Sequence, residues 1–189
     1  MTDTQQIPPR PSFDAELFTT LRGGHAAEKF AASAVAPLVV AARGYETVFP
    51  DEGREAAARH RLGSMNSAAG RKLKENVGAD DAMIMPWYRL DETAAAAHKG
   101  VVAKPTSLQM RPASPILVKG KLRKYDMFAG SQTELDLHPA TPKDWLDTAP
   151  VIFFTEGLIK GDAALTAMLR ANGVSDEELS KVHADGNPA

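Results

Sequence analysis

An uninterrupted apolar run, Val151 to Thr155, constrains the fold of this chain more than any other stretch. Its side chains are large and mostly apolar, and Glu156 and Gly157 follow directly. A run without polar alternation is typical of a strand buried on both faces, as in a parallel sheet. An amphipathic helix is predicted next, over 158–171. We therefore expect an α/β unit with Glu156 at the exposed carboxyl end of a buried strand, where open α/β sheets bind their ligands.

The rest of the chain divides by pattern into a helical part and a strand-rich part. Two short helices are predicted over 26–43, with Pro37 at their junction and Gly44 after the second. Further helices are predicted over 53–61 and 66–75. The pattern changes to strands near Met83, and the strand candidates are 83–90, 107–111, 122–128 and 134–137. A capping box at Ser175 predicts a last short helix.

The predicted fold class is therefore α/β with an α+β N-terminal part. It comprises a helical N-terminal region, a small mixed sheet and a first strand–helix unit of an α/β domain. The expected segments are a disordered lead over 1–12, a helical region over 13–82, a small β-rich region over 83–148 and the start of an α/β domain over 149–189.

The composition excludes several classes of protein. Cysteine is absent, so disulfide frameworks, cysteine-based metal sites and cysteine nucleophiles are ruled out. The first residues are polar and rich in proline and do not contain the apolar segment of a signal peptide. The longest apolar stretch, 31–42, is too short and too rich in alanine to span a bilayer. We expect a cytoplasmic protein with no membrane partner.

Charge is distributed unevenly, although the formal net charge is only −2. Residues 93–125 contain seven lysines and arginines and no acidic residue, whereas 126–189 contain eleven acidic residues and four basic ones. A basic stretch before an acidic end suits a protein that meets phosphates on one face and metal ions on another, but a charge run is more often a solvated loop. The candidate phosphate contacts are Lys119, Lys121, Arg123 and Lys124, with Tyr125 beside them for stacking on a base.

The residues around Glu156 allow two interpretations. In the functional one, Gly157 lets the chain turn sharply and lets a phosphate or metal approach the backbone. The free N–H groups of the following helix would then favour an anion. In the other, Glu156 only interacts favourably with the helix dipole, which contributes about 0.3–1 kcal/mol. The local pattern does not choose between them.

The stretch T-E-G-L-I-K-G-D-A-A-L, residues 155–165, resembles the first motif of Toprim domains, the fold shared by bacterial-type primases and topoisomerases. It is most similar to a divergent Toprim-like family of phage, plasmid and actinobacterial replication proteins, in which the pattern is roughly T-E-G-x-x-K-x-D-A-L. The resemblance covers about residues 26–170. The other matching stretches are A-R-G-Y-E-T-V (42–48), L-Q-M-R-P (108–112), K-Y-D-M-F-A-G-S (124–131) and L-D-L-H-P (135–139).

The resemblance implies roles for four residues. Glu156 would be the general acid or base of nucleotidyl transfer, and Gly157 the turn glycine. Lys160 would contact a phosphate, and Asp162 would be an additional acid. In Toprim enzymes a later strand ends in an Asp-x-Asp pair that holds Mg²⁺, but no apolar strand after Asp162 leads into such a pair. Mg²⁺ is therefore expected only in a complete Toprim site, and the metal ligands are unknown.

The implied function is that of the N-terminal portion of a primase-associated DNA replication protein of a phage or mobile element. Its expected partners are DNA or RNA and a helicase or C-terminal replication domains. We expect the chain to be catalytically inert as a nucleotidyltransferase on its own, and its unpaired strand to promote self-association. Two alternatives stay open: a non-catalytic nucleic-acid-binding or assembly module that uses the basic stretch 99–124, and a truncated remnant with no activity.

Overall fold

This computed structural model describes residues 20–22, 24–52, 81–127 and 134–182. Two short helices lie near the beginning of the described part. Helix α1 spans Gly24–Ser33, and α2 spans Pro37–Arg43. Proline suits the first helical position, and the left-handed φ of +73° at Gly44 lets the chain leave α2. The two helices predicted over 26–43 are thus confirmed. The predicted lead over 1–12 and the predicted helices over 53–61 and 66–75 lie outside the described residues.

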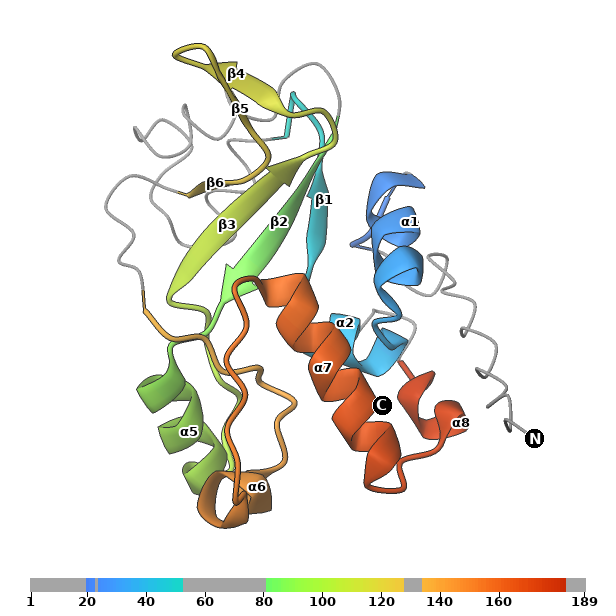
Figure 1. Cartoon of the computed structure of the whole chain (residues 1–189), viewed down its shortest axis with the longest axis vertical. Helices are drawn as coiled ribbons and strands as arrows, with labels where there is room; N and C mark the ends of the chain where they lie inside the picture. The colour runs from blue at the N-terminus through green and yellow to red at the C-terminus, as the bar shows by residue number, and fades with distance from the viewer. Residues whose placement is uncertain (1–19, 23, 53–80, 128–133, 183–189) are drawn as a thin grey trace, which may run out of the picture.

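A four-stranded antiparallel sheet in the order β1-β2-β3-β6 forms the middle of the fold (Figure 1). Its strands are β1 (Glu46–Val48), β2 (Ala82–Trp87), β3 (Ser107–Pro112) and β6 (Asp126–Met127). Strand β2 lies between β1 and β3, and its central position explains why its apolar run is buried. The α+β organisation of this part is confirmed. The sheet was expected to be mixed, but every pairing among the described strands is antiparallel.

The predicted strand boundaries need three corrections. The strand expected over 83–90 ends at Trp87, because helix α5 (Leu90–Lys99) follows at once. The strand expected over 122–128 is divided between two strands, β5 (Lys121–Arg123) and β6. The strand expected over 134–137 is reduced to one isolated bridge between Arg89 and Asp136.

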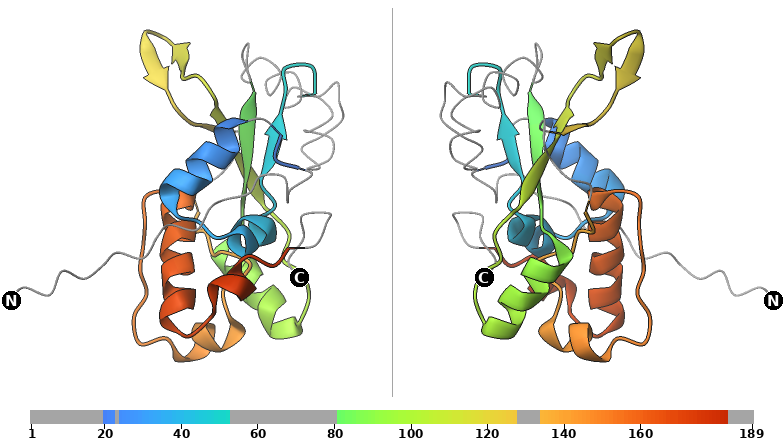
Figure 2. Two further views of the ribbon diagram at one scale, coloured as in Figure 1. Left: turned by 90° about the vertical axis from the view of Figure 1, so that its right-hand side faces the viewer. Right: turned by 90° about the vertical axis from the view of Figure 1, so that its left-hand side faces the viewer.

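A hairpin continues the β3–β6 ladder beyond the main sheet. It consists of β4 (Ile116–Val118) and β5, in a register that places Leu117 opposite Leu122. The two residues at its tip, Lys119 and Gly120, have φ values of +49° and +75°. Positive φ at both central residues is the signature of a type I′ turn, whose twist matches that of the two strands. Figures 1 and 2 show the hairpin projecting beyond the sheet.

The three C-terminal helices are α6 (Lys143–Thr148), α7 (Leu158–Ala171) and α8 (Asp176–Leu179). Helix α7 packs on α1 and α2, α8 packs on α2, and α6 contacts α5. Leucines and an isoleucine of α7 share one hydrophobic core with Phe30 of α1 and Val39 of α2. The helix predicted over 158–171 and the capping box of Ser175 with Glu178 are both confirmed. Within the described ranges, no helix has the length and apolar character needed to cross a bilayer.

Residues 151–155 do not form a strand, which contradicts the buried parallel strand predicted there. The segment is extended and runs from α6 to α7 (Figure 1). Val151, Ile152, Phe153 and Phe154 leave 55–73% of their surface exposed. A strand needs a neighbour that satisfies its backbone N–H and C=O groups, and none of the described strands pairs with this segment. Of the predicted strand–helix unit, the structure therefore contains the helix but not the strand.

Candidate functional site

Glu156 stands at the surface in the turn before α7. Its carboxylate is 80% exposed and accepts a hydrogen bond from the ammonium group of Lys160, one helical turn further on. This hydrogen bond and the positive charge of Lys160 lower the pKa of Glu156 below its usual value. Two residues with expected roles, Glu156 and Lys160, are thus brought together. Their contact is an exposed i,i+4 ion pair, a type that contributes little to stability.

Gly157 is the N-cap residue of α7, with φ of −166°, which is ordinary extended backbone that any residue adopts. A Cβ atom added there would meet no heavy atom within 4 Å. The chain does bend at Glu156 and Gly157 before α7 begins, but neither the backbone conformation nor the surrounding space of the folded chain requires glycine at position 157.

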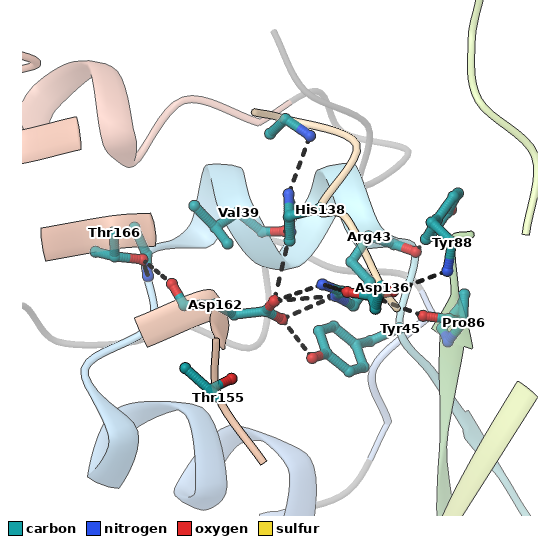
Figure 3. Close-up of polar contacts among 12 residues, drawn as sticks. Val39, Arg43, Tyr45, Pro86, Tyr88, Asp136, His138, Thr155, Asp162 and Thr166 are labelled. Carbon is teal, nitrogen blue, oxygen red and sulfur yellow. Dashed lines mark hydrogen bonds and ion pairs between the residues drawn. The ribbon is translucent and has the colours of Figure 1, made fainter. Parts of the chain in front are cut away.

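Asp162 lies in the interior, away from the surface position of Glu156. Its side chain is 0% exposed. The guanidinium of Arg43 donates from Nε to both carboxylate oxygens at 3.0 Å and from Nη2 to Oδ1 at 2.7 Å. The hydroxyl of Tyr45 donates to Oδ2 (Figure 3). The carboxylate predicted as an additional acid is therefore enclosed by protein groups in the folded chain.

Arg43 also holds a second carboxylate. Its Nη1 donates to Oδ1 of Asp136 at 3.0 Å and to the carbonyl oxygen of Pro86 at 3.1 Å, and its Nη2 donates to Oδ2 of Asp136 at 2.9 Å. The backbone N–H of Tyr88 donates to Asp136 at 2.8 Å, and the hydroxyl of Tyr88 donates to the carbonyl of Arg43 at 3.0 Å. One arginine thus links α2, β2, the loop before α6 and helix α7 (Figure 3).

The charges in this cluster compensate one another. Burial alone would lower the pKa of Arg43, but the carboxylates of Asp162 and Asp136 raise it overall, so the guanidinium is charged. Burial raises the pKa of Asp162, and the hydrogen bonds from Arg43 and Tyr45 oppose that rise. Because the arginine stays protonated, the pair exists as an ion pair shielded from water, which makes its loss costly.

His138 completes the cluster in a neutral form. Its Nδ1 accepts a hydrogen bond from the backbone N–H of Ala140 at 3.0 Å, so the proton resides on Nε2, which donates to the carbonyl of Val39 at 3.0 Å. Burial, followed by the positive charge of Arg43, keeps the pKa of His138 well below its usual value. The ring therefore fastens the loop before α6 onto α2 without carrying charge.

Three of the segments that carry the family resemblance meet in this cluster. Residues 42–48 supply Arg43 and Tyr45, residues 135–139 supply Asp136 and His138, and residues 155–165 supply Asp162. The sequence pattern assigned a role only to Asp162. A signal for the pairing existed, because Arg43 is the one charged residue of an apolar helix and Asp162 falls on the apolar side of α7.

The residues around Glu156 do not fit a Mg²⁺ site. Mg²⁺ takes several oxygen ligands or substrate phosphates. In the part of the chain that the structure describes, no three histidine or acidic side chains are grouped so as to hold a metal ion. Asp162 is committed to Arg43, and Glu156 to Lys160. The described residues therefore provide no basis for a metal-dependent step.

The hairpin brings the four predicted phosphate contacts together at the surface. Lys119 occupies its tip, Lys121 and Arg123 lie on one face of β5, and Lys124 follows directly; all four are exposed. Nη1 of Arg123 lies 2.9 Å from Oδ1 of Asp126, which is 8% exposed. No ion pair joins Lys119, Lys121 or Lys124 to another described residue. We call β4–β5 with these four residues and Arg111 the basic ribbon.

The base of the basic ribbon carries more positive charge. Arg111 of β3 donates a hydrogen bond from Nη1 to the hydroxyl of Tyr125, and its guanidinium carbon lies 5.0 Å from the centre of the tyrosine ring. The pKa of Lys29, on α1, is lowered by burial and then by the positive charges of Arg111 and Lys124. Arg111 and Lys124 therefore lie near enough to Lys29 of α1 for their positive charges to disfavour its protonated form.

The basic ribbon and the Glu156–Lys160 pair lie apart. The hairpin leaves the end of the sheet where β3 finishes, whereas α7 begins near the end of β2, at the other end of the sheet (Figures 1 and 2). The predicted site residues thus form two separate surface groups and one buried residue.

Comparisons of the chain with protein-family models, with curated proteins and with solved structures each return no match.

Proposed function

We propose that this chain binds nucleic acid through the basic ribbon. The observation that carries the proposal is the crowding of cations on an exposed hairpin. Lys119, Lys121 and Lys124 are not ion-paired with any described residue, and the pKa of Lys29 is depressed partly by its positive neighbours. A polyanion bound across this surface would relieve the repulsion and release the counterions that surround its own phosphates.

The shape of the ribbon supports the same function. A two-stranded β-ribbon is narrow enough to enter a groove of a duplex. Lysines at the tip and along one face would meet phosphates on both sides of such a groove. Phosphate contacts position a protein without reading sequence, so we expect binding with little sequence preference.

The experiment is a fluorescence anisotropy titration of labelled DNA and RNA oligonucleotides with the 189-residue chain in about 50 mM salt. The test variant replaces Lys119, Lys121, Arg123 and Lys124 by alanine. The control variant removes the same charge from four exposed lysines elsewhere, Lys99, Lys104, Lys143 and Lys181.

We expect the wild type and the control variant to bind with similar affinity and the ribbon variant to bind at least tenfold more weakly. Equal weakening by the two variants would mean that binding follows net charge, and absence of binding by the wild type would refute the function.

A second proposal keeps the Toprim-like interpretation, in which the chain is part of a replication protein that carries out nucleotidyl transfer on DNA or RNA. The observation that favours it is the position of Glu156, exposed in the turn before α7, next to the apolar segment 151–154, which is also exposed. In this proposal, segment 151–154 forms a strand only when it pairs with a partner, such as a helicase or a further replication domain. Glu156 would then lie at the carboxyl end of that strand. Any Mg²⁺ ligands would come from that partner.

This second proposal is tested by primer synthesis in the presence of Mg²⁺ or Mn²⁺, with the chain alone and with candidate replication partners. We expect no incorporation by the chain alone. Incorporation that appears with a partner and is lost in Glu156→Gln would support the proposal. Incorporation that is unchanged in Glu156→Gln would refute the role of this residue.

A further inference from the structure

The basic ribbon carries an apolar pair on the face opposite Lys121 and Arg123. Leu117 and Leu122 face each other across the hairpin, and they expose 70% and 72% of their surface. Successive residues of a strand point to opposite faces, so Leu122 lies on the face that Lys121 and Arg123 do not occupy. Two adjacent leucines exposed to water offer apolar area whose burial against another molecule is favourable.

The hairpin geometry makes the two leucines a single projection. In a hairpin closed by a two-residue turn, Val118 and Lys121 form the hydrogen-bonded pair beside the turn. The next pair, Leu117 with Leu122, is then the non-hydrogen-bonded pair, in which the Cα atoms lie only about 4.5 Å apart. The side chains of Leu117 and Leu122 thus form one apolar projection, one residue pair back from the tip, which we call the tooth.

The tooth is held on a well-anchored base. The β3–β6 pairing directly precedes the hairpin in space, through Gln109 with Met127 and Met110 with Asp126. The ion pair of Arg123 with Asp126 fastens β5 to this base at 2.9 Å. Figure 2 shows the hairpin standing clear of the helices in both views. These contacts therefore hold the hairpin in a fixed position relative to the main sheet.

We propose that the basic ribbon inserts the Leu117–Leu122 pair into the base stack of duplex DNA and kinks it, while the cations hold the phosphates on either side. The inference rests on the proposed nucleic-acid binding and names its substrate. Proteins that bend DNA commonly insert aliphatic wedges between base steps, and the cost of unstacking is offset by the added protein contacts.

Two features favour duplex DNA over other nucleic acids. Proteins that bind single strands without sequence preference use aromatic platforms for stacking, whereas the tooth is aliphatic and Arg111 lies over the ring of Tyr125. The major groove of an RNA duplex is too deep and narrow for side chains to enter. Double-stranded B-DNA offers both a groove of suitable width and steps that open under a wedge.

The test measures bending and unstacking separately from binding. A DNA duplex of about 25 base pairs carries a dye at each end for energy transfer, and a second duplex carries 2-aminopurine, whose fluorescence rises when its neighbours unstack. The test variant is Leu117→Thr with Leu122→Thr, which keeps the charge and the strand preference of the hairpin. Because both leucines are exposed, this variant should fold with an unchanged Tm.

We expect wild-type protein to raise both the energy transfer and the 2-aminopurine signal. The threonine variant should bind with the same salt dependence but leave both signals at the values of free DNA. Wild-type binding without either signal, or the same signals with the threonine variant, would overturn the wedge and leave the proposed function standing. Tighter binding to single strands or RNA would overturn the choice of duplex DNA. No binding to any oligonucleotide would overturn both proposals.

Discussion

At the scale of single residues, Arg43 makes more buried polar contacts between elements of this fold than Glu156, the residue with a predicted catalytic role. Its side chain is 1% exposed and contacts two carboxylates and a backbone carbonyl. Asp162, which was predicted as an additional acid, is one of these partners. Removing one member of a buried ion pair leaves an uncompensated charge, which commonly costs about 3–5 kcal/mol.

We therefore predict that Arg43→Met and Asp162→Asn each lower the free energy of unfolding by about 3–5 kcal/mol, measured by urea denaturation. Glu156→Gln, which alters only an exposed pair, should change it by less than about 0.5 kcal/mol. The double change Arg43→Met with Asp162→Asn should cost less than the sum of the two single changes, because either change alone already breaks the ion pair between these positions. Equal effects of Asp162→Asn and Glu156→Gln would contradict the buried ion pair.

His138 makes the free energy of unfolding depend on pH. The pKa of His138 in the folded chain lies well below its usual value of 6.5. Between the two pKa values the unfolded chain binds the proton and the folded chain does not, so the free energy of unfolding falls as the pH drops below about 6.5. Above that pH the effect is absent.

We expect the wild type to lose up to about 1.4 kcal/mol of stability per pH unit through this residue below pH 6.5, measured by urea unfolding between about pH 8 and pH 5. His138→Asn should be less stable at pH 8 but should show a flatter pH profile. His98→Gln, at an exposed position, should keep the wild-type profile. An unchanged profile in His138→Asn would contradict a neutral buried ring.

At the scale of elements, local signals predicted those parts of the fold that depend on local interactions. The helix over 158–171, the capping box at Ser175 and the exit from α2 at Gly44 are all confirmed because caps and helical periodicity act within one or two turns. Helix α5 was missed, although its alanine-rich sequence, acidic first turn and Gly100 are typical of a helix.

The strand predicted over 151–155 failed for a different reason. Its apolar and β-branched side chains favour an extended chain, and the segment is extended. Whether an extended segment becomes a strand depends on a neighbour, and the local pattern carries no information about that neighbour. The long-range contacts of Arg43 with Asp136 and Asp162 escaped prediction in the same way, because they join residues 93 and 119 positions apart.

The two glycines at helix ends give a prediction at this scale. Gly44→Ala should lower the free energy of unfolding by about 1 kcal/mol or more, because alanine is strained at the φ of +73° found there. Gly157→Ala should change it by less than about 0.5 kcal/mol, since φ is −166° and a Cβ has open space. Thermal and urea unfolding of both variants provide the measurement. A large loss in Gly157→Ala would mean that the turn before α7 needs glycine after all.

At the scale of the whole molecule, two exposed surfaces are the candidates for binding a partner: the basic ribbon and the apolar segment 151–154. The sequence singled out the cations of the first as candidate phosphate contacts, but it did not predict the hairpin that arranges them. For the second, a short uncharged run of high β-propensity with free edges tends to pair with another chain. We propose that segment 151–154 supports self-association of the purified chain.

Sedimentation velocity tests this association. The mass of the wild type should rise with protein concentration, and Ile152→Asn with Phe154→Asn should shift it toward the monomer without lowering Tm, because both side chains are exposed. The matched control, Leu117→Thr with Leu122→Thr, removes as many exposed apolar side chains from the hairpin and should leave the association unchanged. A monomer at every concentration, or equal effects of the two variants, would contradict a role for 151–154.

The central claim, that the basic ribbon holds nucleic acid, is tested most directly by the slope of log K against log salt concentration. Each phosphate contact contributes about 0.7–0.9 to that slope. We predict that replacing Lys119, Lys121, Arg123 and Lys124 by alanine flattens the slope by about 3 relative to wild type. The matched removal of Lys99, Lys104, Lys143 and Lys181 should leave it within about 1 of the wild-type value. A slope that is the same in wild type and ribbon variant would contradict the claim, as would binding by the wild type that does not depend on salt.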